Sequence, residues 1–165
     1  MPSPTRDQLA DLAAIRDCAL RYSHGIDRLD AEVMRSAYWP DAVDDHGVFV
    51  GNSWQFVDRC MASHDRWRST LHCVLNHWVE LDGPTTARGE VYNLTYLFPT
   101  LGEPSLWVGR YLDRYERRDD EWRILHRTCV HEGTTTLAAT PMAIDAGRFR
   151  SGDVDRATPG RPVGT

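Results

Sequence analysis

Four long strand-like segments in the second half of the chain place the strongest constraint on its fold. They are rich in β-branched and aromatic residues that alternate with polar ones, and they cover residues 69–82, 85–99, 104–118 and 121–136. The segments between them are short and turn-forming, so consecutive strands are expected to pair in antiparallel order. Strands of about 14 residues are longer than average and twist strongly. The sequence therefore predicts a long antiparallel meander that curls on itself.

The first half of the chain shows mainly helical spacing of apolar residues. We expect helices at residues 7–25, 30–38 and 54–67, with a short bent strand pair at 42–50. In this interpretation Gly25 ends the first helix, Asp27 lies just past that end, and Ser53 caps the third helix. Helices on one side of a curled antiparallel sheet make an α+β fold, in which the sheet forms a cone around one mostly apolar cavity. Such a cavity is a natural site for a small molecule.

Length and charge narrow the class of protein. The chain has 165 residues, enough for one domain at 1–140, followed by a C-terminal extension at 141–165 that we expect to be partly disordered. The net charge of −5 argues against a nucleic-acid partner. No apolar run approaches the ~20 residues of a membrane span, and the first residues lack a signal-peptide pattern. We therefore expect a cytoplasmic protein with no membrane partner. Apolar residues within 137–150 would close the cavity of the same subunit or of a neighbour, and the sequence leaves both possibilities open.

Neither the cysteines nor the acidic cluster of the first half predicts a metal site. The cysteines form no CxxC pair, and each lies in an apolar pattern typical of a buried thiol. They are Cys18, Cys60, Cys73 and Cys129. In the Asp44-Asp45-His46 cluster, adjacent strand residues point to opposite faces, so only Asp44 and His46 share one. Two ligands do not make a site, and we expect no metal.

The order of elements and several local motifs resemble the SnoaL-like branch of the nuclear-transport-factor-2-like superfamily. The likeness extends over about residues 8–136. The matching segments are 15–27 (IRDCALRYSHGID), 39–42 (WPDA), 71–72 (LH) and 109–124 (GRYLDRYERRDDEWRI). The resemblance implies a cone-shaped, curved antiparallel sheet wrapped by N-terminal helices. It is less specific for function, because this superfamily includes dehydratases, isomerases, cyclases, epoxide hydrolases and plain binding domains.

Two groups within that family match more closely. Tyr22, Asp27 and His72 match the pattern of bile-acid 7α-dehydratase-like enzymes. Asp27, His72 and the stretch at 115–119 are similar to hexachlorocyclohexane dehydrochlorinase. Scytalone dehydratase is a more distant relative, and this chain lacks an evident second strand histidine at the matching place. All of these are lyases that remove a proton and expel a leaving group from a neighbouring carbon, so the resemblance implies a lyase that needs no metal or other cofactor.

The resemblance assigns chemical roles to the three matching residues. His72 would act as the base, because a neutral imidazole in an apolar pocket accepts a proton well near neutral pH. Asp27 would accept the hydrogen bond of the other ring nitrogen, fix the tautomer and stabilise the imidazolium that forms. Tyr22 would hold a substrate oxygen or protonate a leaving hydroxyl. A structural histidine and a core tyrosine are the alternatives for His72 and Tyr22.

Strand alternation and the resemblance together predict the residues that line the cavity. They are Asp44, Thr70, Asn76, Asn93, Trp107, Tyr111, Arg127 and His131. Arg127 or His131 would stabilise negative charge that develops on the substrate, although a histidine at a sheet edge is the alternative for His131. Tyr92 and Tyr96 alternate to the other face, where aromatic residues are typical of a subunit interface. We therefore expect a homo-oligomer, and the choice between dimer and trimer stays open.

These observations predict a cofactor-independent dehydratase that acts on a steroid-like or polycyclic hydrophobic substrate. A ketosteroid-type isomerase or a polyketide cyclase would use similar residues. A non-catalytic module that binds a small hydrophobic ligand is an alternative of another class, and it predicts that Asp27 and His72 do not touch. A structural assembly domain is a third, and it predicts a cone filled by its own side chains.

Overall fold

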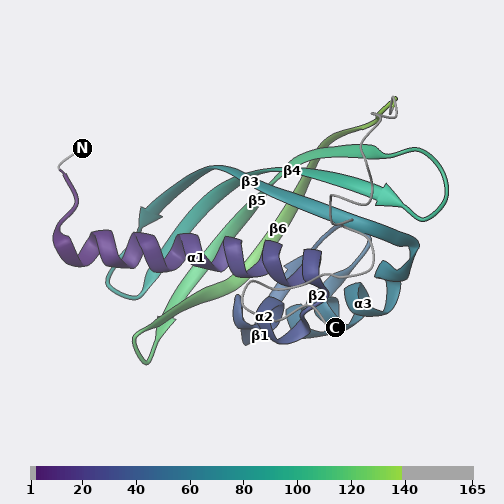
Figure 1. Ribbon diagram of the computed structural model, residues 1–165. Coiled ribbons are helices and arrows are strands. Elements are labelled where there is room, and N and C mark those ends of the chain that lie inside the picture. The colour runs from purple at the N-terminus through teal and green to yellow at the C-terminus, as the bar shows by residue number, and fades with distance from the viewer. Residues whose placement is uncertain (1–2, 139–165) are drawn as a thin grey trace, which may run out of the picture.

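The computed structural model describes residues 3–138, which form three α-helices, one short 3₁₀ helix and a six-stranded sheet (Figure 1). The helices are α1 (Arg6–Arg28), α2 (Ala31–Ser36), α3 (Ser53–Ser63) and η1 (His64–Arg66). The strands are β1 (Tyr38–Asp45), β2 (Val50–Asn52), β3 (Trp67–Leu81), β4 (Thr86–Pro99), β5 (Ser105–Arg118) and β6 (Glu121–Thr136). The four long predicted strands are confirmed, with bounds that differ by no more than two residues.

The sheet has the strand order β2-β1-β6-β5-β4-β3. Strands β3 to β6 form the predicted antiparallel meander, and β1 joins it by pairing parallel to β6. The sheet does not close into a barrel, because β2 and β3 lie at opposite ends of this order. Figure 1 shows α1 lying along one face of the long strands, with α2 and α3 gathered at one end of the sheet. The predicted α+β class and curved sheet are therefore confirmed.

The first helix ends later than predicted, and Gly25 does not end it. Helix α1 continues through Arg28, and Leu29 ends it in the left-handed conformation with φ of 52°. A Cβ at Gly25 would lie 2.5 Å from the backbone nitrogen of Met34, a distance that real Cβ atoms essentially never show. Gly25 is therefore required by the close approach of α2, and Asp27 lies inside the last turn of α1 rather than beyond it.

The elements that follow α1 also differ in detail from the prediction. The side chain of Asn52, and not that of Ser53, caps α3 by accepting from the backbone nitrogens of Trp54 and Gln55. The predicted second helix stops at Ser36, and β1 begins at Tyr38. Pro40 is tolerated within β1 because the pairing with β6 is interrupted between Tyr38 and Val43.

The hydrophobic core lies between α1 and the inner face of the sheet. Ile15, Cys18, Tyr22 and Ile26 follow helical spacing on α1 and are at most 3% exposed. They pack in one cluster with side chains of the long strands, among them Tyr111 and Tyr115. All four cysteines are free: two are buried and two are half-buried.

Some expectations fall on residues outside the described range. The predicted C-terminal extension at 141–165 and most of the apolar stretch at 137–150 lie there. Within residues 3–138, none of the helices combines the length and hydropathy that crossing a membrane requires.

Candidate active site

The centre of the candidate site is a contact between the end of α1 and the middle of β3. Oδ1 of Asp27 accepts a hydrogen bond from Nδ1 of His72 at 2.6 Å, and Oδ2 accepts from the backbone nitrogen of His72 at 2.8 Å. The hydroxyl of Thr70 donates to Oδ1 of Asp27 at 2.7 Å. One carboxylate therefore fixes both the imidazole ring and the strand that carries it.

These hydrogen bonds set the protonation states of the pair. Burial of the Asp27 carboxyl acts to raise its pKa, but the hydrogen bonds from His72 and Thr70 outweigh burial and hold the pKa below its usual value. An ionised Asp27 requires a proton on Nδ1 of His72, which leaves the lone pair on Nε2. No hydrogen bond joins Nε2 to any of residues 3–138, and the His72 side chain is 10% exposed. The pair thus presents an unoccupied proton acceptor.

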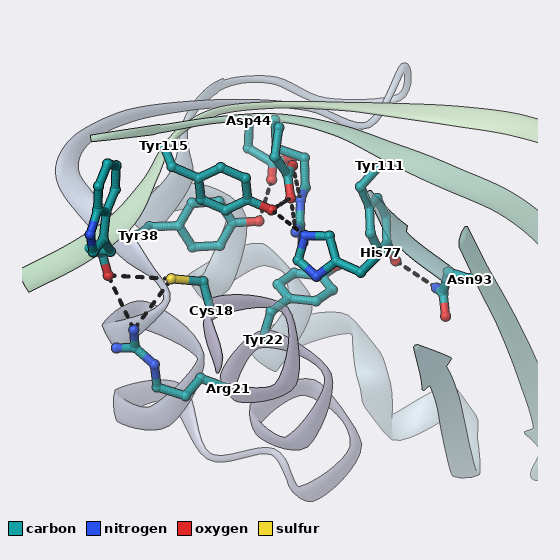
Figure 2. A network of polar contacts seen from close by, with 12 residues as sticks. Cys18, Arg21, Tyr22, Tyr38, Asp44, His77, Asn93, Tyr111 and Tyr115 are labelled. Atoms are coloured by element: carbon teal, nitrogen blue, oxygen red, sulfur yellow. Dashed lines mark hydrogen bonds and ion pairs between the residues drawn. The ribbon is translucent and has the colours of Figure 1, made fainter. Parts of the chain in front are cut away.

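The phenol of Tyr22 lies between this pair and a second histidine. The Tyr22 ring meets His72 edge-on with ring centres 6.2 Å apart and meets Tyr111 in the same way at 5.5 Å. Its hydroxyl lies 3.3 Å from Nε2 of His46. Nδ1 of His46 is hydrogen-bonded to Asp44, which also accepts from the hydroxyl of Tyr38 at 2.7 Å. Figure 2 shows Tyr22, Tyr38 and Asp44, with the hydrogen bond from Tyr38 to Asp44.

Sequence reasoning did not include His46 among the site residues. The available signal was its position two residues after Asp44, which puts both side chains on the same face of a strand. We considered that pair only as metal ligands. Within the part of the chain that the structure describes, no three His, Cys, Asp or Glu side chains gather as metal ligands would.

Arg127, which the sequence predicts to contact substrate, is fully buried. Its side chain has no exposed surface and donates two hydrogen bonds to Asp113, at 2.8 and 2.7 Å. Burial acts to lower its pKa, but the charge of Asp113 more than compensates, so the pKa is raised and the guanidinium stays charged. The guanidinium carbon lies 4.4 Å from the Tyr22 ring centre and 4.1 Å from that of Tyr111. Arg127 therefore holds the aromatic rings of the site by cation–π contact.

Three other predicted lining residues face inward but hold neighbouring side chains instead of a ligand. Thr70, Asp44 and Asn93 are 0%, 0% and 1% exposed. Thr70 bonds to Asp27, Asp44 bonds to His46 and Tyr38, and the amide of Asn93 donates to the hydroxyl of Tyr111 at 2.8 Å (Figure 2). They fix the orientation of the residues around them.

Asn76 was placed in the cavity by an alternation that the structure interrupts. Val74 pairs with Asn93, but His77 pairs with Val91, so β3 has one residue more than β4 between these pairs. This β-bulge reverses the inward and outward positions of β3 from that point. Asn76 is exposed, and His77 takes the inward position, where its Nε2 lies 3.2 Å from the Tyr115 hydroxyl.

Trp107, Tyr111 and His131 form a stacked row of rings. The Trp107 ring stacks on Tyr111 with centres 6.4 Å apart and on His131 at 5.9 Å. A Cβ at Gly109 would lie 2.2 Å from the Trp107 ring, so the absence of a side chain there allows the ring to cover the strand. Tyr111 is 3% exposed, Trp107 is half-buried and His131 is exposed. His131 lies beyond Thr128, the last residue of β6 that pairs with β1, so it also occupies a free sheet edge.

A separate groove of about 870 Å³ lies on the opposite face of the sheet. Its lining includes Val43, Trp78, Glu90, Leu112, Arg114 and His126. On β5, Leu112 and Arg114 alternate with the buried Tyr111 and Asp113, so the groove is separated from the His72 side by the sheet itself. The convergence of Asp27, His72 and Tyr22, and not the groove, identifies the candidate active site.

Comparison with solved structures shows the fold shared with several small proteins. A hexachlorocyclohexane dehydrochlorinase of type 2 superposes with a TM-score of 0.76 at 23% identity, over 85% of this chain and 97% of that one. The type 3 enzyme from Novosphingobium barchaimii LL02 gives 0.75 at 23% identity, over 84% and 97%. A scytalone dehydratase-like protein from Novosphingobium aromaticivorans DSM 12444 gives 0.70 at 19% identity, over 86% and 97%. At these identities the likeness shows the fold alone.

The sequence itself places the chain in a family. No curated protein matches it in sequence. The family model of the SnoaL-like domain matches residues 7–128, which covers α1 and most of the sheet, including Tyr22, Asp27 and His72. This chain therefore belongs to the SnoaL-like domain family of the nuclear-transport-factor-2-like superfamily.

Proposed function

We propose that this protein is a cofactor-independent lyase that removes a carbon-bound proton from a small hydrophobic molecule. The observation that carries the proposal is the Asp27–His72 contact, in which the carboxylate occupies Nδ1 and leaves Nε2 free of hydrogen bonds to residues 3–138. A buried aspartate in that position orients the ring and stabilises the imidazolium that forms when Nε2 takes a proton. A binding module has no need of this arrangement.

The rate that such a base supplies is limited, so the surrounding groups matter. Proton transfer by a positioned side chain contributes about 10²–10⁴-fold, and positioning of the substrate supplies a further share. Tyr22 lies beside His72, and its phenol would serve a leaving hydroxyl. The positive charge of Arg127 over the Tyr22 ring favours negative charge on that phenol as its proton is donated.

The aromatic row supports a hydrophobic substrate with rings. Trp107 is the half-buried member of this row and offers a flat apolar surface, as a steroid-like or polycyclic molecule requires. It stacks on Tyr111, which packs against Tyr22 beside His72. The structurally similar proteins are named for a dehydrochlorination and a dehydration, which are both eliminations. We therefore favour a dehydratase, in which hydroxide departs from the carbon next to the one that loses its proton.

The test uses a fixed panel of compounds: γ-hexachlorocyclohexane, scytalone and a 3-keto-Δ4-steroid that carries a 7α-hydroxyl. Each is incubated with the protein in D₂O, and mass spectrometry follows loss of water or chloride and uptake of deuterium. We expect the wild type to convert at least one compound and His72→Ala to lower turnover 10²-fold or more. His126→Ala is the matched control, because this histidine lines the groove on the opposite face of the sheet. Full turnover by His72→Ala would refute the mechanism, and a product that has lost neither water nor chloride would indicate an isomerase.

We also propose that the protein is a homo-oligomer that buries the outer face of the sheet. Five large apolar side chains on that face are 41–57% exposed: Leu71, Leu75, Trp78, Tyr92 and Leu112. An apolar surface of this kind is typical of a subunit interface. We expect light scattering to report an oligomer for the wild type and a smaller species for Trp78→Asp, with Leu101→Asp in the loop between β4 and β5 unchanged. A monomeric wild type would contradict this proposal.

A further inference from the structure

The second histidine–aspartate pair, Asp44–His46, is a built polar site that the proposed base does not use. Asp44 has no exposed surface and accepts hydrogen bonds from the Tyr38 hydroxyl and from Nδ1 of His46. The His46 ring stacks on Phe56 with centres 4.2 Å apart, and its side chain is 15% exposed. Both contacts fix the ring, and its Nε2 then lies 3.3 Å from the hydroxyl of Tyr22.

The direction of the His46–Tyr22 hydrogen bond depends on the protonation of His46. When the ring is neutral, its Nδ1 proton points at Asp44, so Nε2 can only accept and the Tyr22 hydroxyl must donate to it. When the ring carries both protons, Nε2 donates to the Tyr22 oxygen, and the phenolic proton is free to point elsewhere. When His46 is neutral, the Tyr22 oxygen can therefore only accept a hydrogen bond from a molecule bound next to it. When His46 is doubly protonated, the Tyr22 hydroxyl can donate one.

We propose that the Asp44–His46 pair controls the proton of Tyr22, so that Tyr22 donates to a leaving group only while His46 is doubly protonated. This inference rests on the proposed elimination and adds a positioning residue to it. His72 reversibly takes a proton from a carbon that a carbonyl activates, and the electron pair of that C–H bond is held as an enolate until it forms the new double bond. The C–O bond breaks, the departing hydroxide takes the phenolic proton and leaves as water, and the proton on Nε2 of His46 moves to the Tyr22 oxygen. His46 then regains a proton from solvent, and His72 releases one.

Arg127 provides the charge that this transfer needs at its intermediate point. Its guanidinium lies 4.4 Å from the centre of the Tyr22 ring and favours a transient phenolate there. Burial raises the pKa of Tyr22 well above its ordinary value, so the phenol keeps its proton at rest. The Tyr22 phenol is therefore neutral at rest, and its phenolate is stabilised while it forms. Both properties suit a residue that gives up one proton and takes up another.

Other groups near this pair also carry or can acquire charge, and each must be separated from His46 in an experiment. Tyr22 comes from α1, Tyr111 from β5 and Cys60 from α3, and each contacts the pair or has its own pKa affected by it. The remaining groups are Tyr38 and Asp45 on β1, and Arg127 and Cys129 on β6. Burial raises the pKa of Cys60 and of Cys129 to about 12, so neither thiol titrates in the same range as a histidine.

The test is a proton titration of the ligand-free, full-length protein, so it does not require a substrate. Tyrosine labelled with ¹³C at Cζ reports the hydrogen bonding of each phenol, and ¹⁵N-labelled histidine reports each ring, with Tyr22→Phe and His46→Gln assigning the two signals. We expect the Tyr22 signal to show a step at the same pH as the His46 ring. The step should be absent in His46→Gln and should persist in His72→Gln, while Tyr92 on the outer face shows none.

Two results would overturn this inference: a Tyr22 signal without a step at the His46 midpoint, or a step that survives in His46→Gln. If His46→Gln does not fold, Asp44→Asn replaces it. In Asp44→Asn the His46 and Tyr22 signals should still change at one common midpoint, because the ring and the phenol remain in contact. If their midpoints differ, the coupling is refuted. A titration that refutes the coupling of His46 to Tyr22 says nothing against His72 as the base. A turnover test that refutes His72 as the base does not change the titration result.

Discussion

The two histidine–aspartate pairs inside the sheet use the same side chains but are assembled differently. Asp27 and His72 are 45 residues apart, and their contact joins α1 to β3. Asp44 and His46 are two residues apart on one hairpin, and tertiary structure adds only the partners around them. The first pair leaves Nε2 of its histidine free of hydrogen bonds to residues 3–138, whereas the second uses Nε2 on Tyr22. The difference teaches that the group bonded to Nε2, and not the pair itself, decides whether a buried histidine is suited to act as a base or to direct a proton donor.

The most direct way to break this comparison is to neutralise each carboxylate in turn. We expect Asp27→Asn to lower deuterium uptake into a panel compound that the wild type converts by 10²-fold or more, because the amide no longer fixes the tautomer of His72. Asp44→Asn should leave deuterium uptake within about threefold but slow the loss of the leaving group by tenfold or more, since only the acid side is affected. Mass spectrometry measures both quantities in one reaction. Equal losses in the two variants would contradict the division of roles.

The position of Asp27 depends on the packing of α1 against α2, and Gly25→Ala tests this dependence. The new Cβ would lie 2.5 Å from the backbone nitrogen and 2.6 Å from the Cβ of Met34, so the helices must separate. We expect the free energy of unfolding to fall by about 2 kcal/mol, a typical cost of overpacking. Urea denaturation measures it. Gly133→Ala is the control, because nothing lies within 4 Å of a Cβ there, and an equal loss in both variants would show that the effect is not steric.

His77 sharpens the comparison as an inward histidine that has no carboxylate partner among the described residues. Burial lowers its pKa from an ordinary 6.5 to about 4. The unfolded chain therefore binds a proton before the folded protein does, and the free energy of unfolding falls as pH decreases from 6.5 to 4. We expect this residue to account for roughly 2 kcal/mol of that loss after allowance for partial exposure.

The measurement for His77 is urea denaturation at pH 7 and at pH 4.5, for the wild type and for His77→Gln. The glutamine can still bond to the Tyr115 hydroxyl but does not titrate, so the variant should lose less stability between the two pH values. His131→Gln should lose as much as the wild type, because His131 is exposed. A His77→Gln variant with the wild-type pH dependence would show that this histidine is not held neutral.

The smallest effect is expected at Asn76, which the β-bulge places outside the site. Asn76→Ala should change the free energy of unfolding by less than about 0.5 kcal/mol, as is usual for an exposed side chain. Turnover should stay unchanged as well. Asn93→Ala is the contrast, because it removes the hydrogen bond to Tyr111 within the aromatic row and should lower both stability and turnover. A large loss of turnover in Asn76→Ala would mean that this residue does contact the substrate.

Local patterns predicted much of this molecule. The strands at 67–81, 86–99, 105–118 and 121–136 were found to within two residues, because alternation and turn residues act over a few positions. The positions of Asp27 and His72 came from the family resemblance, since an isolated aspartate or histidine in a sequence has no distinctive pattern. His46 is visible beside Asp44, but the local sequence offers the pair only as two metal ligands, which are too few for a site, because the partner that gives His46 a role, Tyr22, lies on another element.

By itself the sequence determined the order of the elements, the antiparallel meander and the family, because each of these depends on short-range periodicity or on recognisable motifs. Tertiary structure alone decided which side chains reach the site. The bulge after Val74 exchanged Asn76 for His77, and pairing with Asp113 on the neighbouring strand buried Arg127 beneath the tyrosine rings. The physical reason is that one extra residue in a strand reverses the inward and outward positions of all the residues after it. A buried charge, in turn, must lie next to its counter-charge. Neither effect can be read from the local sequence.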